Sequence, residues 1–156
     1  MTLRPFLFVL LAATLSACNS TDSNPSNTSE LYTTNVSGSG QKGPFNEDSL
    51  VTITKLDQLL EPIPSSTINT QVIGNQGNFE FNDLNSWDDS WIEISVSGQY
   101  FDELQGLDST ESISLSTITF KNKTDKVANI HLFSHLAAAR IKQNISNGMN
   151  SIDAWK

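Results

Sequence analysis

The chain has 156 residues, enough for one globular domain with a short leader and a linker. Its formal net charge of −8, from 17 acidic and 9 basic side chains, argues against nucleic acid as a partner, because nucleic-acid-binding surfaces are basic. A single cysteine excludes a disulfide within the chain and a zinc site built from several thiolates.

Residues 1–17 have the layout of a secretory signal peptide. Arg4 is followed by the apolar run "PFLFVLLAA" and by small residues before Cys18. The run is too short for a membrane span, which needs about 20 apolar residues. We therefore expect residues 1–17 to be removed.

The stretch "LSAC", residues 15–18, resembles the lipobox of bacterial lipoproteins at every position. The resemblance implies a diacylglyceryl group on the Cys18 thiol, cleavage just before Cys18, and an acyl chain such as palmitate on the new amine. Two or three chains hold a protein at a bilayer, whereas one binds reversibly. Asn19 stands where enterobacteria-like sorting uses Asp to retain lipoproteins in the inner membrane. We therefore expect anchorage in the outer membrane of the cell envelope, with its periplasmic or surface face left open.

The segment 18–30 is predicted to be the lipidated cysteine and a flexible tether, because "NSTDSNPSNTSE" has no large apolar side chain to bury. Removal of residues 1–17 takes away Arg4 and no acidic side chain, so the formal charge of −8 becomes −9. Between Lys55 and Lys121 there is no basic residue at all. This acidic part is expected to stand off an anionic lipid surface.

Residues 31–120 are predicted to form an antiparallel β-sandwich, because short runs alternate between apolar and polar residues. The "GNQGN" segment, residues 74–78, predicts a hairpin turn, since glycine supplies the positive φ that such turns need. After Ser116 the apolar phase slips, which predicts a bulge or break near Thr117. The alternating apolar positions are Val51, Ile53, Phe79, Phe81, Ile92, Ile94, Val96, Ile113 and Leu115.

Residues 121–156 are predicted to be a helical extension. Apolar residues recur at three- and four-residue spacing over residues 127–145, with Gly148 as the stop, and Ser151 is expected to cap a second helix. We expect the stripe to pack against the sandwich and Arg140 and Lys142 to reach its acidic surface. An apolar Trp155 near the end suggests that the extension is truncated at Lys156. The expected stripe consists of Ile130, Phe133, Ala137 and Ile141.

Three segments, "SGQKGPF" (39–45), "GQYFDELQG" (98–106) and "NIHLFSHLAAARI" (129–141), resemble a family of bacterial lipoproteins. The β part of these proteins is similar to transthyretin-like and Cna B-type sandwiches, often called carboxypeptidase regulatory-like. The resemblance implies this fold over most of the mature chain, and it implies no activity. It also implies a longer chain, because family members continue past the position of Lys156.

Three groups of residues are candidates for chemistry. Asp83, Asp88 and Asp89 lie on one loop and offer the oxygen ligands that calcium prefers. His131 and His135 have the spacing of paired zinc ligands, but Leu132 stands where a zincin has its glutamate. The Cna B-type resemblance adds Lys42, with Glu80 or Glu93, as a candidate for a Lys-to-Asn isopeptide. The nucleophile-elbow pattern Gly-x-Ser-x-Gly does not occur in the sequence.

These observations predict a lipid-anchored envelope protein that is not an enzyme and whose sandwich is an interaction or spacer module. Expected contacts are the membrane, through the lipid, and an unidentified protein or glycan, with no nucleic acid. No cofactor is expected apart from the lipid, with calcium as the exception left open. An alternative is a glycan- or calcium-binding surface lipoprotein that uses Trp87 and Trp91, whose aromatic faces suit sugars. A further alternative is the N-terminal stalk of a larger protein.

Overall fold

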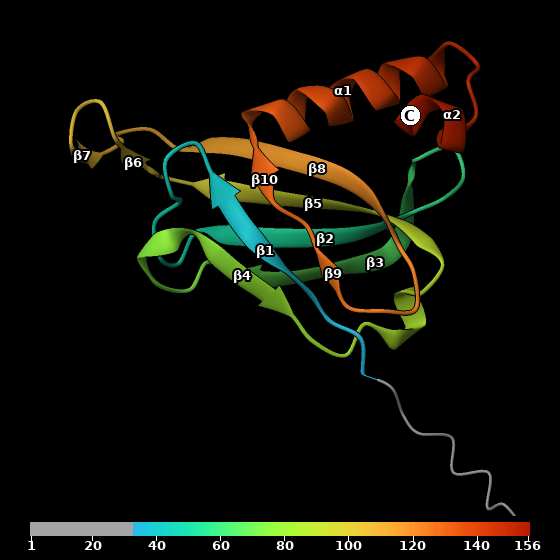
Figure 1. Ribbon diagram of the computed structural model, residues 1–156, viewed down its shortest axis with the longest axis horizontal. Helices are drawn as coiled ribbons and strands as arrows, with labels where there is room; N and C mark the ends of the chain where they lie inside the picture. Colours follow the sequence, from blue (N-terminus) through green and yellow to red (C-terminus); the bar gives the residue numbers. More distant parts are fainter. Residues whose placement is uncertain (1–32) are drawn as a thin grey trace, which may run out of the picture. The chain divides into compact units, whose positions relative to one another are not determined.

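The computed structural model describes residues 33–156 (Figure 1). The predicted signal peptide, Cys18 and the tether to residue 30 lie outside these residues. The described part is mainly β and ends in helices, which confirms the predicted antiparallel β-sandwich with a C-terminal amphipathic helix.

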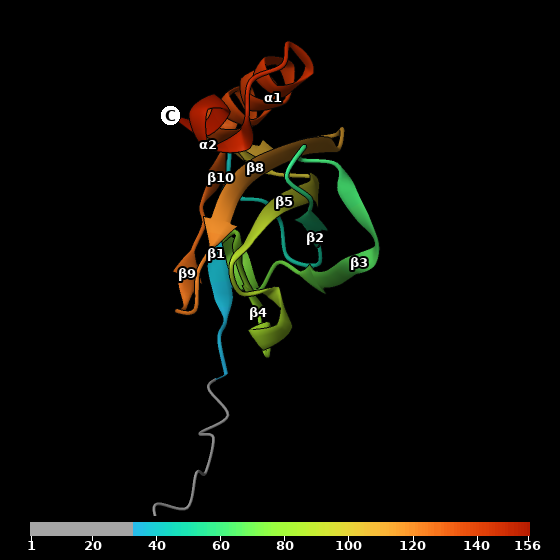
Figure 2. The same cartoon turned by 90° about the vertical axis from the view of Figure 1, so that its right-hand side faces the viewer.

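The larger sheet has four antiparallel strands in the order β3-β2-β5-β8. They are β2 (Leu50–Leu56), β3 (Pro62–Gln71), β5 (Ser90–Gly98) and β8 (Ile113–Lys121). Their alternation of apolar and hydroxyl residues puts one face in the main core, as the period of two predicts. The other face is mostly polar, except where Leu56, Trp91 and Ile118 enter a second core under the helices. The buried face points toward the smaller sheet (Figure 2).

The smaller sheet is built around β1 (Val36–Gln41), which pairs antiparallel with β4 (Asn78–Phe81). On its other side β1 pairs in parallel with β9 (Lys126–Val127) and β10 (Ile130–His131). A separate short hairpin consists of β6 (Phe101–Asp102) and β7 (Leu107–Asp108). The chain after β8 therefore returns to complete the smaller sheet before any helix begins.

The main core lies between the two sheets. Its side chains come from the inward positions of both sheets and from the loops that close the ends. Among them, Phe45 and Ile130 are completely buried. The other members include Val36, Val51, Ile53, Phe79, Phe81, Leu84, Trp87, Ile92, Ile94, Val96 and Leu115.

A turn is present at residues 74–78, but the predicted hairpin is wrong, because the chain on its two sides is joined only by the isolated bridge Ile73↔Asn78. A 3₁₀ turn, η1 (Gly74–Gln76), sits between Ile73 and Asn78, and the Ile73 amide donates to the Asn78 carbonyl at 2.7 Å. Gly74 has φ 68° and Gly77 has φ 71°, the left-handed conformation for which glycine was expected. The flanking strands β3 and β4 belong to different sheets, so the turn carries the chain across the sandwich.

The bulge expected near Thr117 is wrong. Strand β8 pairs with β5 in unbroken register from Gly98↔Ile113 to Ser90↔Lys121. The apolar phase changes because β8 is buried on both faces: Leu115 lies in the main core, whereas Ile118 lies in a second core under the helices. A change of burial, not of backbone geometry, explains the sequence pattern.

Helix α1 (Leu132–Ser146) begins later than the predicted residue 127, because residues 126–131 are taken up by β9 and β10. His131 caps it: its Nδ1 accepts from the Ser134 amide at 3.2 Å. The chain then turns at Gly148, with φ 93°, into α2 (Ser151–Trp155). The cap of α2 is Asn150, not the expected Ser151, and the Asn150 side chain accepts from the Asp153 amide at 3.0 Å.

The predicted apolar stripe of α1 is wrong at Phe133 and Ala137. Phe133 is 78% exposed, while Ala138 and Ile141 are buried. The cap at His131 sets the helical phase, and the face toward β8 is then formed by Ser134, Ala138 and Ile141. The expected charge contact is confirmed for Lys142, whose Nζ lies 2.8 Å from the Glu93 carboxylate on β5.

Candidate functional site

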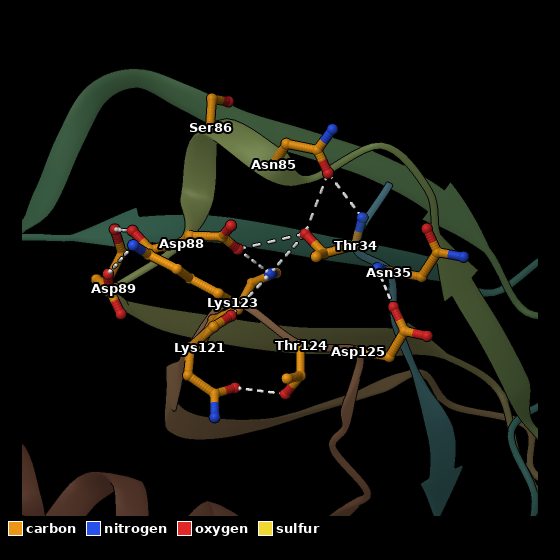
Figure 3. Close-up of polar contacts among 12 residues, drawn as sticks. Thr34, Asn35, Asn85, Ser86, Asp88, Asp89, Lys121, Lys123, Thr124 and Asp125 are labelled. Atoms are coloured by element: carbon orange, nitrogen blue, oxygen red, sulfur yellow. Dashed lines mark hydrogen bonds and ion pairs between the residues drawn. The ribbon is translucent and has the colours of Figure 1, made fainter. Parts of the chain in front are cut away.

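Lys121, the last residue of β8, is completely buried although it is charged. It occupies the same side of β8 as Ile113 and Leu115, so its side chain points between the sheets, which explains its burial. Its Nζ lies 2.5 Å from Asp88 Oδ1, 2.9 Å from Thr34 Oγ1 and 3.1 Å from the Asn122 carbonyl oxygen (Figure 3). All three ammonium protons are thereby used.

A second layer of hydrogen bonds extends from this lysine (Figure 3). The Thr34 amide donates to Asn85 Oδ1 at 2.7 Å, and Asn85 belongs to the short 3₁₀ turn η2 (Asn85–Trp87). Nearby, the Asn35 amide donates to Asp125 Oδ1 at 2.8 Å. The chain leading into β1 is therefore tied both to the loop before β5 and to the loop after β8. We call Lys121, Asp88, Thr34 and Asn85 the lysine clamp.

The three calcium candidates are not brought together. Asp88 pairs with Lys121, and Asp89 faces Lys123 at 3.8 Å between exposed side chains. Asp83 adopts φ 60° on the exposed loop, where its amide donates to Asn35 Oδ1 at 3.4 Å. Within residues 33–156 no group of three or more His, Cys, Asp or Glu is arranged to hold a metal ion. A cation at Asp88 would also have to displace a buried ammonium group.

The two histidines have separate partners. His131 Nδ1 caps its own helix, and His135 Nδ1 accepts from the Ser116 amide on β8 at 3.1 Å. A hydrogen bond from a backbone N–H therefore orients each imidazole ring. His135 packs on the sheet with its Nδ1 hydrogen-bonded, which is the usual state of a buried polar atom.

Lys42 does not meet either glutamate named for an isopeptide. Its Nζ lies 2.6 Å from the Tyr100 hydroxyl and 4.1 Å from the centre of that ring. Glu80 accepts from the Asn35 side chain, and Glu93 pairs with Lys142. Lys42 therefore acts as a cation held over an aromatic face.

An aromatic groove of about 730 Å³ lies on the outer face of the larger sheet, beside α2. Trp91 and Phe120 are directly opposite each other on β5 and β8, with ring centres 5.3 Å apart. Helix α2 adds Trp155, whose ring centre lies 6.2 Å from that of Trp91. The indole N–H of Trp155 donates to the Ile118 carbonyl at 3.4 Å. The polar side chains of the rim are Asp57, Gln58, Asp89, Ser90, Asn150, Ser151 and Lys156.

The two tryptophans named from the sequence have different places. Trp87 is only 7% exposed and belongs to the main core, so its part in a sugar site is wrong. Trp91 lines the groove but is itself only 9% exposed, so its expected exposure is wrong as well. Phe120 and Trp155, at 39% and 50% exposure, supply most of the accessible aromatic surface. Sequence reasoning missed Phe120, because its outward position depends on the unbroken register of β8.

The three segments that carry the family resemblance meet at one end of the sandwich. Gln41 pairs with His131, and Phe45 forms a bridge with Tyr100. A Cβ on Gly43 would lie 1.8 Å from the Phe101 carbonyl oxygen, so only glycine allows this approach. Each segment therefore has a packing role, as the sequence predicted for the first two.

Comparison with known protein families, with curated proteins and with solved structures gave no match. Among residues 33–156, no helix is both long enough and apolar enough to cross a membrane. The resemblance to bacterial lipoproteins thus stays a prediction from the quoted residues.

Proposed function

We propose that this chain is a lipid-anchored cell-envelope protein whose β-sandwich is a non-enzymatic interaction module. The observation that carries the proposal is the aromatic groove, an open surface with a fixed apolar floor and a polar rim. The lysine clamp supports a structural role for the buried charges, because its polar atoms are satisfied by one another. The leader and "LSAC" support the anchor.

Replacing Cys18 with Ser is expected to abolish lipid attachment, because the hydroxyl cannot form the thioether. The parent protein should incorporate labelled palmitate and fractionate with outer-membrane markers, whereas the variant should do neither. A Ser16→Ala variant, which keeps a small residue before the cysteine, is the matched control and should behave as the parent. Acylation of the Cys18→Ser chain would contradict the lipid anchor. Recovery of the parent protein with inner-membrane markers would contradict the outer membrane as its destination.

A glycan is the ligand that the groove favours, in place of the calcium alternative. The C–H faces of pyranose rings stack on aromatic rings, and the exposed parts of Phe120 and Trp155 offer two such surfaces side by side with Trp91. Carboxylate and amide groups at Asp89, Gln58 and Asn150 are suited to sugar hydroxyls. The volume of about 730 Å³ falls within the range of small-molecule sites.

Uncharged oligosaccharides are expected to bind at this groove. Titration of the full chain with chitotriose, cellotriose and maltotriose should show heat of binding and a change in tryptophan emission for at least one of them. Trp155→Ala should weaken that binding about tenfold or more, equivalent to roughly 1.4 kcal/mol. Phe133→Ala, which removes an aromatic side chain exposed elsewhere, is the matched control. Absence of binding to all three sugars contradicts the glycan, while the Cys18 experiment tests the anchor separately.

A further inference from the structure

Two segments expose large apolar side chains: the hairpin of β6 and β7, which projects from the sandwich, and helix α1, which runs along it (Figure 1). The first is the acidic hairpin, residues 101–108, which includes β6 and β7. The second is the helix face, formed on α1 by Leu132, Phe133 and Leu136 together with Arg140. Contiguous exposed apolar surface of this kind marks interaction sites in soluble domains.

The acidic hairpin presents its apolar side chains on a rigid turn. Leu104 is 99% exposed and Leu107 is 66% exposed. The turn is held by Asp102, whose Oδ1 accepts from the Leu104 amide at 2.9 Å and whose carbonyl accepts from the Gly106 amide at 2.7 Å. At its base the Phe101 amide donates to the Pro44 carbonyl at 2.8 Å. Leu104 is therefore presented to solvent by a fixed backbone.

The hairpin is also uniformly acidic. Asp102, Glu103 and Asp108 lie within residues 101–108, which contain no basic residue. An apolar tip surrounded by carboxylates selects a partner surface that is apolar and positively charged.

The helix face has the complementary character. Phe133 is 78% exposed, Leu136 57% and Leu132 48%, while the opposite side of α1 is buried on β8. Helix α1 contains no acidic residue. Lys142 is committed to Glu93, whereas Arg140 forms no ion pair within the described residues 33–156.

We propose that the acidic hairpin of one molecule docks on the helix face of a second copy of this chain. A twofold axis that brings each hairpin onto the partner's helix forms two equal contacts, which closes the dimer. Charge complementarity favours a second copy as the occupant. The contact sets Asp102, Glu103 and Asp108 of the hairpin against a helix that exposes Arg140 and has no acidic residue.

Disulfide trapping between two differently tagged full chains tests this arrangement. One chain carries Leu104→Cys and the other Phe133→Cys; they are co-expressed, extracted in mild detergent and oxidised with copper–phenanthroline. A dimer carrying both tags is expected. Thr67→Cys on the exposed strand β3, in place of Phe133→Cys, is the matched control and should give none. Parent chains without an added cysteine measure any disulfide-linked dimer that Cys18 itself forms. Failure to trap the mixed dimer, or an equal yield with Thr67→Cys, overturns the proposal and indicates that another partner covers these patches.

A charge exchange separates docking from a general effect on folding. Arg140→Glu and Glu103→Lys are each expected to lower the yield of trapped dimer about fivefold or more. Combining Arg140→Glu on the Phe133→Cys chain with Glu103→Lys on the Leu104→Cys chain should restore the yield. If the exchanged pair stays as low as the single variants, the charges do not face each other and the proposed arrangement is wrong.

Discussion

Asp88→Ala is expected to lower the free energy of unfolding by about 3 to 5 kcal/mol, the range for removing one partner of a buried ion pair. Lys121 is completely buried, and Asp88 is its only anionic partner among residues 33–156. With the carboxylate removed, the ammonium group keeps only the Thr34 hydroxyl and the Asn122 carbonyl. Urea unfolding followed by circular dichroism should show a clearly lower midpoint.

The neighbouring residue provides the matched control for this prediction. Asp89 faces Lys123 at 3.8 Å with both side chains largely exposed, so Asp89→Ala should cost no more than about 1 kcal/mol. Adding Lys121→Met to Asp88→Ala removes the unpaired charge and should recover most of the lost stability, because an apolar side chain of similar length suits this buried position. Equal midpoints for Asp88→Ala and Asp89→Ala would show that Lys121 is not held as described.

Ile141→Ala is expected to lower the free energy of unfolding by about 2 to 5 kcal/mol, the range for removing a buried isoleucine side chain. Ile141 is 7% exposed and belongs to the second core, which joins α1 and α2 to the outer face of the larger sheet. Loss of its side chain leaves a cavity in this second core. Thermal and urea unfolding should both report the loss.

Phe133→Ala is the control on the same helix. Phe133 is the larger side chain, yet at 78% exposure its removal should change the free energy of unfolding by no more than about 0.5 kcal/mol. The two variants distinguish the observed helical phase from the stripe predicted by spacing alone. A large loss for Phe133→Ala with a small one for Ile141→Ala would mean that α1 is rotated from the orientation described.

Several features of the fold could be predicted from local patterns. The alternation in β2, β5 and β8 requires only that one face of each strand be apolar, and the turn at residues 74–78 needs only glycine at positive φ. The contact of Lys142 with the acidic sheet followed from charge alone. The signal layout and "LSAC" are likewise properties of consecutive residues, which makes them readable without any fold.

Tertiary structure decided what the residues of β8 and α1 face. Strand β8 is buried on both sides, so a period-two pattern could not show that Leu115, Phe120 and Lys121 enter three different surroundings. The phase of α1 depends on where its cap forms, and this was set when β9 and β10 paired with β1.

The lysine clamp and the aromatic groove were decided in the same way. The clamp joins Thr34 to Lys121 across 87 positions of sequence, and the groove joins Trp91 to Trp155. Such contacts depend on which strands become neighbours. The burial of the apolar faces of whole strands determines that pairing, and the individual residues in these contacts do not. The sequence by itself determined the acidic charge and the alternating strands, and it predicts the leader, because each depends on the amino-acid sequence alone. Only the packing of the sheets and helices decided which side chains were buried and which stayed exposed.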